Sequence, residues 1–121
     1  MERPHKKLDV WKMAMELVID IYGVTKTFPG EEKFGLTDQL RRAAVSVPSN
    51  IAEGASRNTK KEFANFLYMA QGSLSELDTQ SEIALKLGYV ESKDFENLEL
   101  KMDRIGKMIT GLIKTVKYRE S

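Results

Sequence analysis

Residues 94–116 read DFENLELKMDRIGKMITGLIKTV, and this stretch decides the fold. Its apolar side chains recur at alternating steps of three and four residues, which places them on one stripe of an α-helix. No stretch of the chain alternates apolar and polar residues over the length of a strand. The pattern therefore predicts a long amphipathic helix, whose apolar stripe consists of Phe95, Leu98, Met102, Ile105, Ile109, Leu112 and Val116.

Three more stretches with the same periodicity precede this one. The spacing predicts helices over about residues 8–28, 37–57 and 59–87. Pro48 falls inside the second of them, where proline removes a backbone donor and crowds the preceding turn, so we expect a kink there. Because short connections make consecutive helices antiparallel, the expected architecture is all-α: an up-down-up-down four-helix bundle whose second helix is kinked at Pro48.

Both ends of the third helix carry local signals. Thr59 and Glu62 form the T-x-x-E pattern of a capping box, in which the threonine hydroxyl accepts a hydrogen bond from a backbone amide. Gly88 stands where the end of a helix favours the left-handed conformation that glycine adopts without strain. These signals predict a helix boundary at each position.

The composition fits one globular domain over residues 1–121, with residues 1–7 as a flexible arm. The chain has 19 basic and 18 acidic residues and a formal net charge of +1, so an argument for nucleic-acid binding has to come from local clustering. The absence of cysteine excludes thiolate metal sites and fits a reducing compartment. We see no signal peptide and no apolar run long enough to span a membrane, and we expect a cytoplasmic protein without a membrane partner.

The sequence carries none of the usual enzyme signatures. Its single histidine, His5, falls in the arm, so the Glu-x-x-His pairs of a di-metal bundle cannot form. No glycine-rich phosphate loop, nucleophile elbow or zinc-binding spacing is present. The carboxylates of Glu76, Asp78 and Glu82 are explained by a solvated helix face. We predict a protein that is not an enzyme and has no cofactor or metal.

The first helix has more apolar surface than its own core needs. A second stripe lies beside the core stripe, and its residues follow steps of four, three and four. Either this wider surface is buried between neighbouring helices of one chain, or it forms a subunit interface, for which tryptophan and tyrosine are typical. We favour the interface and predict a homo-oligomer. The interface residues would be Trp11, Met15, Val18 and Tyr22.

Polar and basic side chains gather locally and allow two interpretations. The polar face of the second helix is either solvated or in contact with another subunit or a phosphate backbone. The basic residues, to which the arm adds Arg3, Lys6 and Lys7, are either solvated or bind phosphates in a salt-sensitive way. The polar face consists of Ser46, Ser49, Asn50 and Glu53, and the candidate nucleic-acid-binding residues are Arg41, Arg42, Arg57, Lys60, Lys61, Arg104, Lys107 and Lys114.

Four segments of the chain resemble, in order, those of one bacterial family. The longest is DQLRRAAVSVPSNIAEG at residues 38–54; the others are LDVW at 8–11, SLSEL at 73–77 and LGY at 87–89. They are similar to segments of the four-helix-bundle proteins encoded in intervening sequences of 23S ribosomal RNA genes. That family is related to the accessory proteins of diversity-generating retroelements.

The resemblance implies a four-helix bundle that assembles as a homo-oligomer, a pentameric ring, with a role in binding nucleic acid. In the related accessory proteins a basic surface engages a reverse transcriptase and RNA. The resemblance implies no catalytic residues. Two functions therefore stay open: an oligomer that binds RNA or DNA backbones, and an interaction scaffold that docks a partner protein, such as a reverse transcriptase, without touching nucleic acid.

Overall fold

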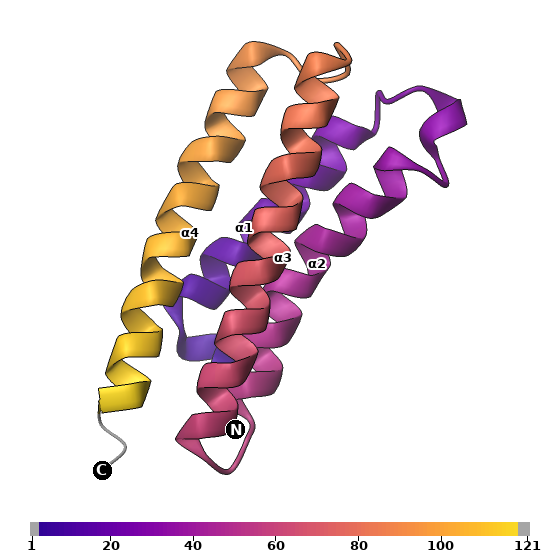
Figure 1. Ribbon diagram of the computed structural model, residues 1–121. Helices are drawn as coiled ribbons and strands as arrows, with labels where there is room; N and C mark the ends of the chain where they lie inside the picture. Colours follow the sequence, from indigo (N-terminus) through magenta and orange to yellow (C-terminus); the bar gives the residue numbers. More distant parts are fainter. Residues whose placement is uncertain (1–2, 119–121) are drawn as a thin grey trace.

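The computed structural model describes residues 3–118, without the side chain of Tyr118. Within these residues all regular secondary structure is helical, which confirms the all-α four-helix bundle (Figure 1). None of the described helices is both long and apolar enough to cross a membrane. The four long helices are α1 (Asp9–Thr25), α2 (Leu36–Ala55), α3 (Lys60–Lys86) and α4 (Ser92–Tyr118), and two short 3-10 helices are η1 (Pro4–Lys7) and η2 (Gly30–Glu32).

The helices α3 and α4 contact one another in opposite residue order. Along the seam between α3 and α4, later residues of α3 meet earlier residues of α4, as they do between antiparallel helices. The contacts are Lys117 with the hydroxyl of Tyr68, Gln71 with Thr110 at 2.8 Å, and Leu74 with the backbone of Gly106.

The predicted apolar stripes form one continuous core. In α4, Leu98, Ile105 and Ile109 are buried, but Ile113 is buried in place of Leu112, which is only partly covered. An α-helix has 3.6 residues per turn, so a stripe drawn with a period of 3.5 drifts around the helix after two or three turns. The drift explains why Ile113 replaces Leu112, while Val116 in the next turn is buried as predicted.

The predicted caps of α3 are both present. Thr59 Oγ1 accepts a hydrogen bond from the backbone amide of Glu62 at 3.1 Å. Gly88 has a φ of 79°, and the backbone amide of Tyr89 donates to the carbonyl of Ala84 at 2.9 Å, which closes the helix as expected for this motif. These bonds satisfy backbone groups that a helix end otherwise leaves without partners.

One helix boundary differs from the sequence prediction. The first helix ends at Thr25 instead of near Phe28, and Phe28 is buried against the ring of Tyr89 with 5.3 Å between the ring centroids. In the expected flexible arm, Pro4–Lys7 forms η1, and His5 lies 5.0 Å from the ring of Trp11. Residues 1 and 2 of the arm lie outside the described residues.

The helices α2 and α3 share the most extensive contact in the bundle and lie close together at Gly54. A Cβ atom placed on Gly54 would lie 2.7 Å from Cβ of Phe66 and 3.0 Å from the ring of Phe63. Further along the same seam, the hydroxyls of Ser46 and Ser73 are 2.8 Å apart. Pro48 lies inside α2, which continues through it, and the kink stays a prediction.

We expect Gly54→Ala to destabilise the protein, because overpacking a well-filled seam costs about 1–3 kcal/mol. Gly72→Ala is the matched control: Gly72 also lies within a long helix, but a Cβ there meets no atom within 4 Å. Alanine should therefore stabilise α3 at Gly72 by up to about 1 kcal/mol. Urea denaturation measures both, and two changes of the same sign would contradict the close-packing argument.

Candidate nucleic-acid interface

Three segments that are far apart in the sequence bring basic residues to one end of the bundle. The turn between α2 and α3 and the last turns of α4 lie together at the lower end in Figure 1. The start of α1 joins them, because Leu8 and Val10 line a hollow with Leu112. Residues 3–12, 57–61 and 107–117 hold ten basic residues and one acidic residue. We call these ten residues the basic end: Arg3, Lys6, Lys7, Lys12, Arg57, Lys60, Lys61, Lys107, Lys114 and Lys117.

The opposite end of the bundle has the reverse charge. Residues 20–33 and 76–99 hold ten acidic residues and only four basic residues. We call this region the acidic end. The near-zero net charge of the chain therefore conceals a separation of charge along the bundle axis, with the excess of basic residues at the basic end.

Five of the eight candidate nucleic-acid-binding residues belong to the basic end, and three do not. Arg41 lies towards the acidic end, where its Nε donates to the buried hydroxyl of Thr25 at 2.9 Å and its guanidinium lies 4.5 Å from the ring centre of Tyr22. This arginine joins α1 to α2. Arg42 is 80% exposed and pairs with Asp38 at 2.9 Å, and Arg104 is exposed in the middle of α4.

The polar face predicted on α2 is divided between different contacts. Ser46 and Asn50 serve packing: Ser46 contacts Ser73 of α3, and the amide of Asn50 donates to the carbonyl and hydroxyl oxygens of Ser46 at 2.9 and 3.0 Å. Glu53 pairs with Arg57 at 3.3 Å. Ser49 is exposed and lines a hollow between α1 and α2.

That hollow is an apolar groove of about 360 Å³. Three residues of the second stripe line it: Trp11 and Val18 are partly buried, and Met15 is 40% exposed. Tyr22, the fourth, lies beyond the groove, and Arg41 stacks on its ring. The chain therefore covers the stripe only in part. The other lining residues are His5, Val45, Pro48, Ser49 and Ala52.

The seam between α3 and α4 is hollowed along its length and changes charge midway. Towards the basic end, Lys114 and Lys117 line a groove of about 480 Å³. The adjoining hollow, of about 620 Å³, includes Lys107 but also Asp78 and Asp103. The acidic residues of α3 thus face acidic residues of α4, a juxtaposition that the solvated-face interpretation of α3 did not predict.

This carboxylate cluster changes the acidity of Glu99. A hydrogen bond with Asp78, partial burial, and the charges of Asp78, Asp103 and Glu82 together raise the pKa of Glu99 from 4.5 to about 7. The protonated Glu99 can donate to the Asp78 carboxylate, whereas two ionised carboxylates repel each other. Among residues 3–118, no three histidine or carboxylate side chains are arranged to hold a metal ion.

The raised pKa makes stability depend on pH. Between pH 4.5 and about 7 the folded chain holds a proton on Glu99 that the unfolded chain releases, so stability falls as pH rises through this window. Glu99→Gln should remove this fall and unfold at a higher temperature than the parent at pH 8. Glu96→Gln, an exposed position on the same helix, is the control. Equal pH dependence of the melting temperature in all three proteins would contradict the assignment.

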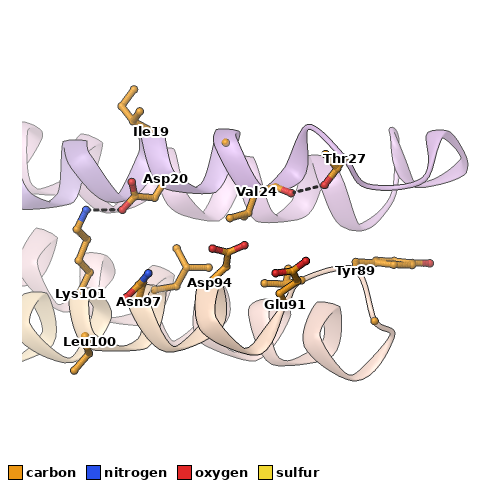
Figure 2. A pocket seen from close by; sticks show the side chains of 14 residues that line it. Ile19, Asp20, Val24, Thr27, Tyr89, Glu91, Asp94, Asn97, Leu100 and Lys101 are labelled. Carbon is orange, nitrogen blue, oxygen red and sulfur yellow. Dashed lines mark hydrogen bonds and ion pairs between the residues drawn. The ribbon is translucent and has the colours of Figure 1, made fainter.

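A larger groove, of about 930 Å³, lies between α1 and the first half of α4 (Figure 2). Its polar walls include Asp20, Glu91 and Asp94, and Figure 2 shows Lys101 of α4 paired with Asp20 of α1. Ile19 and Leu100 line it as well and are 68% and 70% exposed. This groove belongs to the acidic end, and no candidate nucleic-acid-binding residue lines it.

Sequence reasoning did not find the grooves, because each needs the register between two helices. One local signal was present: Tyr68 falls outside the apolar stripe of α3, and it is 48% exposed in the structure. An aromatic residue outside a core stripe marks a position that packing does not explain.

Comparisons with known proteins agree with this fold. The sequence model of the 23S rRNA-intervening sequence protein family matches residues 6–111, which confirms the family resemblance. A crystal structure of a protein with unknown function from the S23 ribosomal protein family of Bacteroides thetaiotaomicron is 24% identical. It has a TM-score of 0.80 over 87% of this chain and 95% of that chain, and at this identity the likeness shows the fold alone. No curated protein matches the chain.

Proposed function

Because the chain belongs to the 23S rRNA-intervening sequence protein family, we propose that it is a non-enzymatic, cytoplasmic homo-oligomer that binds the phosphate backbone of RNA or DNA. The observation that carries this proposal is the basic end, where three segments bring together ten basic residues against Asp9, Glu53 and Glu62. Lysine and arginine that neutralise phosphates release bound counterions, which gives sequence-independent affinity. The acidic end would repel the same backbone and so confines contact to one end.

If the basic end binds nucleic acid, reversing the charge of its lysines should weaken binding more than the same change at the acidic end. Lys61→Glu with Lys114→Glu reverses two charges of the basic end; Lys86→Glu with Lys93→Glu makes the same change in net charge at the acidic end. The first pair should weaken binding of a labelled oligonucleotide by roughly tenfold or more at 0.1 M salt and flatten the salt dependence. The second should leave both nearly unchanged. Fluorescence anisotropy measures both quantities, and equal effects would contradict a localised interface.

Oligomerisation would increase the positive electrostatic potential at the basic end. In a closed ring every copy has the same orientation relative to the axis, so the basic ends of all copies lie at one level and their potentials add. The apolar groove between α1 and α2 supports such an assembly, because Trp11, Met15 and Val18 are only partly covered within one chain. The family resemblance implies five copies.

We expect Met15→Asp to dissociate the oligomer, because it places a charge in the apolar groove that the second copy would cover. Met69→Asp is the matched control: Met69 is 53% exposed on α3 and does not line that groove. Sedimentation at micromolar concentration should show monomers for the first variant and the parent mass for the second. An unchanged mass for Met15→Asp, or a parent that is itself monomeric, would remove this part of the proposal.

The groove of Figure 2 favours a second function, docking of a partner protein. Its exposed apolar side chains, Ile19 and Leu100, lie among carboxylates, which suits an amphipathic segment with basic residues. Such a partner would bind at the acidic end. Reversing the charges of Lys61 and Lys114 would then leave partner binding unchanged while it weakens nucleic-acid binding. This difference separates the two functions.

A further inference from the structure

We propose that Tyr68 and the α3–α4 groove beside it bind an unpaired nucleobase, so that the protein prefers single-stranded over double-stranded nucleic acid. This inference rests on the proposed function and names the form of nucleic acid that the basic end recognises. It comes from Tyr68 itself, an exposed aromatic side chain that lines a groove among the lysines of that end.

The residues that line the groove suit a nucleobase, which has flat apolar faces and polar edges. It has a volume of about 480 Å³ and is lined by an aromatic ring, a buried aliphatic side chain and two lysines. Tyr68 is 48% exposed, which leaves much of its surface open to a ligand, and Ile113 is buried beneath. Stacking on an aromatic ring is how proteins bind single strands without sequence preference, because every base has a flat π face. The six lining residues are Tyr68, Gln71, Thr110, Ile113, Lys114 and Lys117.

The two lysines lie where they can contact the phosphate of a bound nucleotide, and they leave the face of the Tyr68 ring open. Lys117 Nζ lies 3.4 Å from the phenolic oxygen of Tyr68 but 5.7 Å from the ring centroid. The ammonium therefore sits near the oxygen edge of the ring and not over its centre. With Lys114 on the same groove, a base stacked on the ring would have cationic side chains beside its own phosphate.

A polar pair at the side of the groove can accept different bases. The Gln71 amide donates to Thr110 Oγ1 at 2.8 Å, which holds the amide in place. An amide group has a second hydrogen and an acceptor oxygen, so it can hydrogen-bond the edges of several bases. This contact would tolerate many sequences.

The charge of the seam favours a strand in the lower half of the groove. Beyond Gln71 the hollow is lined by Asp78 and Asp103 as well as by Lys107 and Lys114, so the excess of positive charge ends there. A duplex keeps its base faces stacked inside and presents only edges and backbone, so it cannot use Tyr68. Single strands gain the stacking contact in addition to the backbone contacts.

The test compares a labelled 12-nucleotide single strand with the duplex of the same sequence, on the full chain. Tyr68→Ala should weaken single-strand binding about tenfold, because the base loses the aromatic ring on which it stacks. Duplex binding should change little, and the salt dependence should stay the same because no charge is removed. Tyr68→Phe should restore single-strand binding. Met69→Ala, at the neighbouring exposed position, is the control.

A second measurement reports the stacking itself. A single strand that carries 2-aminopurine should lose fluorescence on binding to the parent and to Tyr68→Phe, and lose less on binding to Tyr68→Ala. If the parent binds both strands but Tyr68→Ala changes neither affinity nor quenching, the stacking site is overturned while the proposed function stands. If the parent binds neither strand at low salt, the proposed function fails and this inference fails with it.

Discussion

The close approach of α2 to α3 is the constraint on which the rest of the structure depends. At Gly54 the seam has no room for a methyl group, because the side chains of Phe63 and Phe66 already fill it. Helices that pack this tightly have a fixed register, and the contact between Ser46 and Ser73 lies on the same seam. The turn at residues 57–61 follows directly from this seam and lies at the same end of the bundle as the last turns of α4 (Figure 1).

The same constraint explains the unusual composition of residues 38–54. This run is rich in small and polar residues for a helix that is buried on one side, yet Ala43, Ala44 and Gly54 are buried. Small side chains let the backbones come close, and hydroxyl and amide groups then satisfy one another across the narrow seam. Ser46 bonds Ser73 across the seam, and Asn50 of the same helix as Ser46 donates to the Ser46 hydroxyl. The run that carries the family resemblance thus builds the bundle, and the positive charge that could hold a ligand lies mostly outside it.

The sequence predicted what depends on short-range physics. The caps at Thr59 and Gly88 involve residues within one or two turns, so both were correct, and the apolar stripe of α4 was correct except that Ile113 is buried in place of Leu112. Features that depend on the register between helices could not be predicted from the sequence. The raised pKa of Glu99 arises from Asp78 on another helix, and the role of Arg41 as a link from α2 to Thr25 is invisible in a helix pattern. The basic segments were recognised one by one, but only the folded chain places three of them together.

The segregation of charge along the bundle gives each chain a permanent electric dipole moment, although its formal net charge is only +1. A polyanion exerts a torque on such a molecule before the two surfaces touch, within the roughly 8–10 Å that physiological salt leaves unscreened. The chain would turn its lysine-rich tip forward during diffusion. A larger share of random collisions would then be productive, and aligned copies in a ring would add their moments.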